Sequence, residues 1–100
     1  MLGIFKSLFS SKPKIDFDSL VSNGAIVVDV RTEGEFAGGH AKNSLNIPLD
    51  KLPKNLSRLK KGKPIIVCCA SGMRSSSAKT ILKNNGFSEV YNVGSWRNLR

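Results

Sequence analysis

Two nearly unbroken runs of apolar residues most constrain the fold of this 100-residue chain. One covers residues 25–30 and the other covers Ile65–Cys69, and both are rich in valine and isoleucine. A strand with one face in water would alternate apolar and polar residues, whereas a continuous apolar run of this length is expected of a strand covered on both faces. The runs therefore predict buried strands of a sheet.

Segments with helical signals separate the segments that resemble strands. Thr32 and Glu35 have the spacing of a capping box, and three leucines between residues 49 and 61 recur at the spacing of a surface helix. We expect strands at residues 25–30, 44–47, 65–69 and 90–93, and helices at residues 33–37, 49–61 and 75–84, with a further short helix that Asp18 or Ser19 caps. Strands that alternate with helices through short links imply a parallel sheet between helices.

The composition fits one domain. A chain of this length with 40% hydrophobic residues can bury one core but not two. The formal net charge of +9 predicts attraction to anions. The two cysteines are adjacent and accompany a single histidine, so they neither join distant segments nor complete an ordinary zinc site. We therefore expect free thiols, no metal or cofactor, and a reducing, cytoplasmic location.

The first 14 residues form an apolar and basic segment that we place outside the domain of residues 15–100. Its apolar side chains could line one face of a short amphipathic helix. The segment is too short and too interrupted to cross a membrane, and it lacks the pattern of a signal peptide. We interpret it as a flexible segment, or one that packs on the domain, with peripheral membrane contact as the alternative.

The second apolar run ends in both cysteines and leads through a polar loop into a helix. The N–H groups of such a loop and the positive end of the helix make a cradle for an anion. A cysteine at the base of the cradle would have a lowered pKa and act as a nucleophile. Strand alternation predicts that Cys68 is buried and that Cys69, where the turn starts, is exposed, so Cys69 is the candidate nucleophile. Arg74 would offer its charge to an oxyanion substrate.

Three motifs resemble the signatures of rhodanese-like domains, over roughly residues 15–97. They are Asp29-Val30-Arg31 followed by Glu35-Phe36, Gly39-His40, Ser44 and Asn46-Ile47-Pro48; the loop Cys69-Ala70-Ser71-Gly72-Met73-Arg74-Ser75; and Gly86-Phe87 followed by Val90, Val93 and Gly94. The resemblance implies a three-layer α/β sandwich in which a five-stranded, mainly parallel sheet has helices on both faces.

The resemblance also implies a sulfurtransferase of the thiosulfate sulfurtransferase, or rhodanese, type. Cys69 would take the outer sulfur of a donor such as thiosulfate, hold it as a persulfide, and pass it to a thiol or to cyanide. The substrate-binding residues that the resemblance assigns, through the N–H groups of the loop, are Ala70, Ser71, Gly72, Met73 and Arg74. We expect a monomer that uses a small-molecule donor and acceptor.

Two other functions stay open. Counted from Cys68, the spacing to Arg74 is that of a Cys-x5-Arg phosphatase, although Val67 stands where those enzymes usually have histidine. The third function is a noncatalytic binding or sensor module built on the same fold. Inactive members of the family typically lack the cysteine, which disfavours that interpretation.

Several other polar residues are interpreted as structural. His40 follows a glycine pair at a turn, where an imidazole more often binds backbone than catalyses. Asp29 and Arg31 are expected to form an ion pair or a brace for the loop. The basic run over residues 51–63 has no interleaved aromatic residues, so we expect no specific nucleic-acid binding. Its charge suits the docking of an acidic partner protein.

Overall fold

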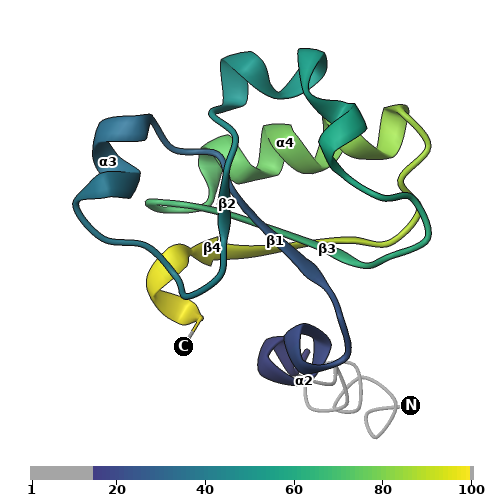
Figure 1. The fold of residues 1–100 in the computed structure, drawn as a ribbon, viewed down its shortest axis with the longest axis horizontal. Coiled ribbons are helices and arrows are strands. Elements are labelled where there is room, and N and C mark those ends of the chain that lie inside the picture. Colours follow the sequence, from purple (N-terminus) through teal and green to yellow (C-terminus); the bar gives the residue numbers. More distant parts are fainter. Residues whose placement is uncertain (1–14, 100) are drawn as a thin grey trace, which may run out of the picture.

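A computed structural model describes residues 15–99, which form one sheet between two layers of helices (Figure 1). The strands are β1 (Ile26–Asp29), β2 (Leu45–Asn46), β3 (Ile65–Cys69) and β4 (Val90–Ser95). The α-helices are α2 (Phe17–Ser22), α3 (Glu33–Ala37) and α4 (Met73–Asn84), and the 3-10 turns are η1 (Leu49–Lys54), η2 (Leu56–Arg58) and η3 (Trp96–Asn98). The predicted three-layer α/β architecture is confirmed.

The strands lie in the order β2-β1-β3-β4, and every neighbouring pair is parallel. The expected parallel sheet is thus confirmed, but within residues 15–99 it has four strands and not the five that the family resemblance implied. The local reason is that the chain between residue 15 and β1 forms α2, so each of the four strand-like segments of the sequence supplies one strand.

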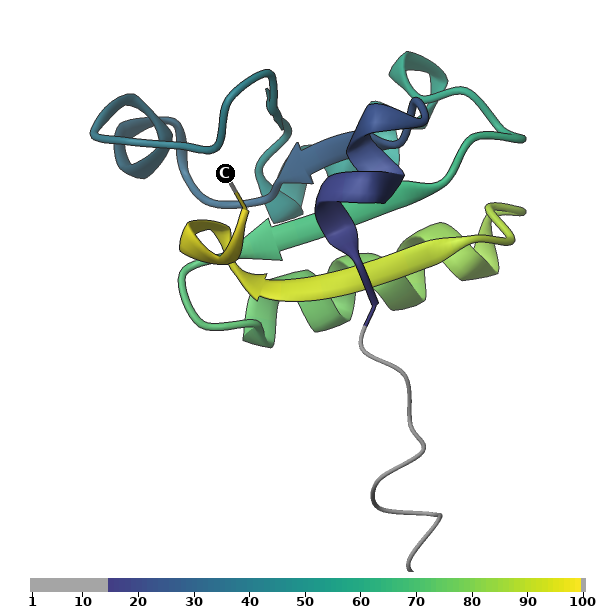
Figure 2. The same cartoon turned by 90° about the horizontal axis from the view of Figure 1, so that it is seen from below.

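Each face of the sheet has its own apolar core, and Figures 1 and 2 show helices on both faces from two directions. Ile65, Val67 and Cys69 of β3 pack with residues of α4, η1 and η2, whereas Ile66 and Cys68 pack with residues of α2 and η3. The side chains of a strand alternate between its faces, so every residue of β3 is buried. This two-sided burial explains the unbroken apolar run and confirms the expectation of helices on both faces.

The helix expected over residues 49–61 is wrong. In its place are η1 and η2, because Pro53 lies inside this segment and has no N–H group to continue an α-helix. The apolar pattern that suggested a helix still faces the core: Leu52 and Leu59 are buried, and Leu56 packs against them.

Two helix starts also differ from expectation, and one is confirmed. The cap of α2 is Asp16 and not Asp18 or Ser19, because the Asp16 carboxylate accepts a hydrogen bond from the Ser19 N–H at 3.0 Å. Helix α4 begins at Met73 and not at residue 75. The capping box of α3 is present as predicted.

The carboxyl ends of parallel strands meet at one edge of a sheet, where ligands of open α/β folds bind. Here α3 follows β1, the loop of residues 70–72 follows β3 and η3 follows β4, so these segments gather at that edge (Figure 1). The predicted N-terminal segment, residues 1–14, lies outside the described residues. No helix within residues 15–99 is long and apolar enough to cross a membrane.

Candidate active site

Both cysteines are free thiols and both are buried, with exposed fractions of 0% for Cys68 and 1% for Cys69. The burial of Cys68 was predicted, but the expected exposure of Cys69 is wrong. Strand β3 continues through Cys69, and the loop then folds back over its sulfur, so that the Gly72 N–H donates to Sγ at 2.9 Å. The two thiols therefore lie in the cores on opposite faces of the sheet.

The two thiols differ in acidity. Burial raises the pKa of Cys68 to about 12, because the charged form loses its hydration. Burial acts on Cys69 in the same direction, but hydrogen bonds from the Ser75 hydroxyl and from the N–H groups of Ser75, Gly72 and Ser71 outweigh it. The pKa of Cys69 consequently falls to about 7. Near neutral pH the thiolate of Cys69 is therefore far more accessible than that of Cys68, which stays protonated.

The backbone at Gly72 makes this arrangement possible. Gly72 has a φ of +110°, which side-chain-bearing residues rarely adopt, and a Cβ there would lie 3.3 Å from the Cα of Gly94 on β4. It is also the N-cap of α4, so the positive end of a twelve-residue helix starts beside the sulfur. The glycine therefore lets the loop turn its N–H group toward Cys69.

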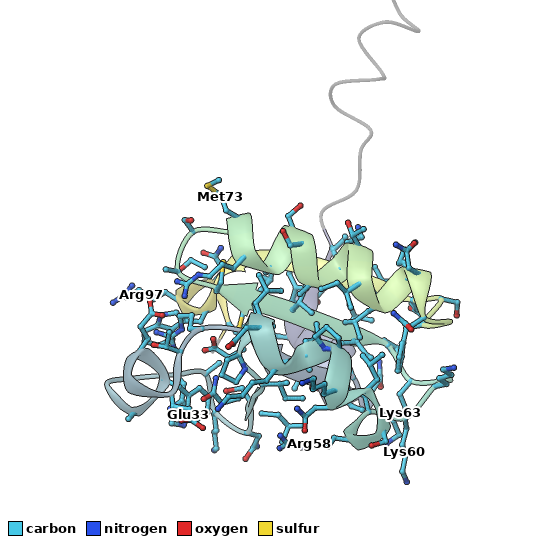
Figure 3. The ribbon with its side chains drawn as sticks, turned by 90° about the horizontal axis from the view of Figure 1, so that it is seen from above. Glu33, Arg58, Lys60, Lys63, Met73 and Arg97 are labelled. Atoms are coloured by element: carbon cyan, nitrogen blue, oxygen red, sulfur yellow. The ribbon has the colours of Figure 1, made fainter. Side chains whose placement is uncertain are left out.

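The structure divides the expected cradle residues into two groups. Ser71 and Gly72 direct their N–H groups at the Cys69 sulfur, as does Ser75, which the prediction did not include. Ala70 lies at the exposed surface of the loop. The side chain of Met73 is 80% exposed and points away from the body of the domain (Figure 3).

A network of polar side chains connects the loop and the start of α4 to β4. Ser75 Oγ lies 3.4 Å from Cys69 Sγ and donates a hydrogen bond to Asn92 Oδ1 at 2.6 Å. Asn92 Nδ2 in turn donates to the Gly72 carbonyl at 3.1 Å. Sequence reasoning missed Asn92, and the signal that could have found it is a polar residue inside an apolar strand segment. Asn92 thus joins the loop and Ser75 to the sheet.

The charge of Arg74, expected to serve an oxyanion, is paired within the domain. Its guanidinium donates to both carboxylate oxygens of Glu35 on α3, with Nη1–Oε1 at 2.7 Å and Nη2–Oε2 at 3.0 Å. The hydrogen bonds from Arg74, followed by those from Thr32, lower the pKa of Glu35 to about 2. Glu35 therefore remains ionised over the whole neutral range.

The residues interpreted as structural have structural contacts. Asp29 and Arg31 form a buried ion pair at 2.7 Å, and the Arg31 guanidinium lies over the ring of Trp96 at 4.8 Å. His40 Nδ1 bonds the Phe36 carbonyl at 2.7 Å, and the two rings stack with centroids 3.7 Å apart. Residues 15–99 contain no group of three or more His, Cys, Asp or Glu side chains arranged for a metal ion.

A parallel α/β sandwich with an acidic cysteine beneath a glycine loop, at the carboxyl edge of its sheet, matches the resemblance to rhodanese-like domains. Comparison with protein families agrees, because the model of the Rhodanese-like domain family matches residues 15–99. This chain belongs to the rhodanese-like domain family.

Similar proteins include named sulfurtransferases. The thiosulfate sulfurtransferase GlpE of Stutzerimonas stutzeri (strain A1501) is 35% identical over 85 residues, which are 85% of this chain and 78% of that protein. The uncharacterized protein YqhL of Bacillus subtilis (strain 168) is 38% identical over 69 residues, which are 69% of this chain but only 55% of YqhL. Among solved structures, the human single-domain sulfurtransferase TSTD1 has a TM-score of 0.75 and 26% identity, over 82% of this chain and 87% of that one.

Proposed function

We propose that this protein is a sulfurtransferase that carries a sulfane sulfur as a persulfide on Cys69. The observation that carries the proposal is the set of hydrogen bonds that converge on the buried Cys69 sulfur from the loop and Ser75. These donors stabilise a thiolate, and a persulfide anion that extends from the same sulfur needs the same donors. The similarity to the GlpE sulfurtransferases adds independent support.

In the first step of the proposed reaction, the Cys69 thiolate attacks the outer sulfur of a donor such as thiosulfate. A bond forms between the two sulfur atoms, the sulfur–sulfur bond of the donor breaks, and its electron pair leaves on sulfite. In the second step a thiolate or cyanide attacks the outer sulfur of the persulfide and releases the Cys69 thiolate. We propose that the N–H groups of residues 70–74 bind these substrates: Ala70, Ser71, Gly72, Met73 and Arg74.

The two alternatives fit the geometry less well. A Cys-x5-Arg phosphatase would need Cys68 as its nucleophile, but this thiol lies on the other face of the sheet from α4, and burial raises its pKa to about 12. A noncatalytic module would not need a cysteine whose pKa is held at about 7. Sulfur transfer through Cys69 is therefore the function that we favour.

A turnover assay tests the proposal. The protein is supplied with thiosulfate and cyanide, and thiocyanate formation is measured for the parent chain and for Cys69→Ser and Cys68→Ala. We expect Cys69→Ser to abolish turnover and Cys68→Ala, which keeps a small apolar side chain in the core, to retain it. Turnover that survives in Cys69→Ser, or an aryl phosphatase activity that requires Cys68, would contradict the proposal.

A further inference from the structure

The strongest unexplained feature of the site is that its loop has a single charged side chain, Arg74, and that this side chain is already paired with Glu35. Arg74 is the only charged residue between Cys69 and Ala78. Both terminal nitrogens of its guanidinium donate to the carboxylate of Glu35. The paired donors that could bind a sulfonate or a phosphate are therefore already bound to a carboxylate. The pair is about one-third exposed, with side-chain exposures of 36% and 37%, so it lies within reach of an incoming donor.

Glu35 is fixed in this position by contacts of its own. Its Oε1 atom accepts hydrogen bonds from the N–H and the hydroxyl of Thr32, both at 3.1 Å, as part of the capping box of α3. Its backbone carbonyl accepts a hydrogen bond from Arg31 at 3.3 Å, which ties α3 to the buried ion pair below. Glu35 therefore cannot turn away from Arg74 without losing its side-chain half of the capping box.

Within residues 15–99, two other cations near this edge are paired with carboxylates and a third stacks on an aromatic ring. Arg31 is buried against Asp29, and Lys51 lies 3.7 Å from the Glu33 carboxylate. Arg97, at the same end of the molecule as Met73 in Figure 3, stacks over Trp96 at 4.6 Å. A dianion that approaches the Arg74–Glu35 pair meets repulsion from the carboxylate almost as large as the attraction to the guanidinium.

We propose that Glu35 is a specificity-determining residue that, by holding Arg74, makes the Cys69 site select an organic persulfide over a dianionic donor such as thiosulfate. This inference rests on the proposed function and names its preferred substrate class. With an organic persulfide, the Cys69 thiolate attacks the outer sulfur, and the electron pair of the donor's sulfur–sulfur bond leaves on the organic thiolate. The outer sulfur keeps its proton, so the products are the Cys69 persulfide and a thiolate. No oxyanion has to be bound in this step.

The test compares two donors in the variant Glu35→Gln. Glutamine keeps the length and the capping interaction of Glu35 but removes its charge, so it leaves the positive charge of Arg74 unbalanced without removing the cap. The donors are thiosulfate and the persulfide of N-acetylcysteamine, whose organic part is uncharged. The rate constant of persulfide formation on Cys69 is measured for each donor by rapid quenching and intact-mass analysis. We expect Glu35→Gln to raise the thiosulfate rate constant about tenfold and to change the other by less than about twofold.

Two further variants isolate the role of the ion pair. Glu33 lies on the same helix as Glu35 but pairs with Lys51 and not with Arg74. Glu33→Gln therefore removes the same charge without affecting Arg74, and we expect it to leave the ratio of the two rate constants unchanged. In Glu35→Gln/Arg74→Gln, which has no charged group at either position, we expect the thiosulfate gain to be lost.

The outcomes separate this inference from the proposed function. If the parent chain forms no persulfide with either donor, the proposed function fails and the inference fails with it. If persulfide forms but Glu35→Gln leaves the donor ratio unchanged, only the inference is overturned. It is also overturned if Glu33→Gln shifts the ratio equally, or if the gain persists without Arg74.

Discussion

The Ser75 hydroxyl lies 3.4 Å from the Cys69 sulfur and gives its one proton to Asn92 Oδ1 at 2.6 Å. When Cys69 is a thiol, its S–H can donate to Ser75. When Cys69 is a thiolate, the hydroxyl can turn its proton to the sulfur, because the Gly94 N–H at 2.9 Å still satisfies Asn92 Oδ1. The side chain of Ser75 can thus serve both charge states of Cys69 without leaving a buried polar atom unpaired.

Removal of the Ser75 hydroxyl should therefore make Cys69 less acidic. In Ser75→Ala we expect the pKa of Cys69 to rise above its value of about 7, because burial would then be opposed by fewer hydrogen bonds. The pKa is read from thiolate ultraviolet absorbance during a pH titration, with Cys69→Ser as the blank. Ser76→Ala, which changes an exposed position on the same helix, is the control and should leave the midpoint in place. An unaltered midpoint in Ser75→Ala would remove Ser75 from the account of Cys69 acidity.

The rate of sulfur uptake should follow the ionisation of Cys69. Only the thiolate attacks, so the rate constant of persulfide formation is expected to be low in acid, to rise as the pH passes through about 7, and to level off above it. Cys68→Ala should give the same profile, since Cys68 remains protonated throughout this range. A midpoint close to 9, the ordinary value for a cysteine thiol, would mean that the loop does not stabilise the thiolate.

A side chain at Gly72 should cost stability. The residue has a φ of +110° and little space toward Gly94, so we expect Gly72→Ala to lower the free energy of unfolding by about 1–3 kcal/mol. Gly34→Ala is the matched control, since a Cβ at Gly34 meets nothing within 4 Å and alanine favours the helix in which it lies. Urea unfolding measures both, and equal stabilities for the two variants would contradict the role given to Gly72.

The buried pair of Asp29 and Arg31 should be far more important for stability than the exposed pair of Glu33 and Lys51. Asp29→Asn leaves the Arg31 guanidinium buried without its carboxylate, and we expect a loss of about 3–5 kcal/mol in the free energy of unfolding. Glu33→Gln, whose side chain is 76% exposed, should change this free energy by less than about 0.5 kcal/mol. Thermal or urea unfolding of the two variants checks the contrast, which fails if their losses are similar.

The sequence predicted those features that depend on neighbouring residues. Strand alternation predicted the burial of Cys68, and the spacing of Thr32 and Glu35 identified the cap of α3. Both depend on side-chain periods that the backbone imposes locally. The same local patterns misjudged residues 49–61, where Pro53 outweighs the spacing of the leucines.

The features that the sequence did not predict depend on contacts between distant segments. Cys69 is buried because a loop folds back over it, which strand alternation does not report. Asn92 reaches Ser75 only through the pairing of β3 with β4. Arg74 meets Glu35 across 39 positions of the chain, so its expected freedom to bind an anion could be assessed only once α3 and α4 were placed.

The central claim, that Cys69 and not Cys68 carries the sulfur, is tested most directly by the intact mass of the protein after incubation with a sulfane-sulfur donor. The parent chain, Cys69→Ser and Cys68→Ala are treated alike with thiosulfate and with an organic persulfide. Our account predicts one added sulfur atom on the parent chain and on Cys68→Ala, and none on Cys69→Ser. An adduct that persists in Cys69→Ser and disappears in Cys68→Ala would contradict it.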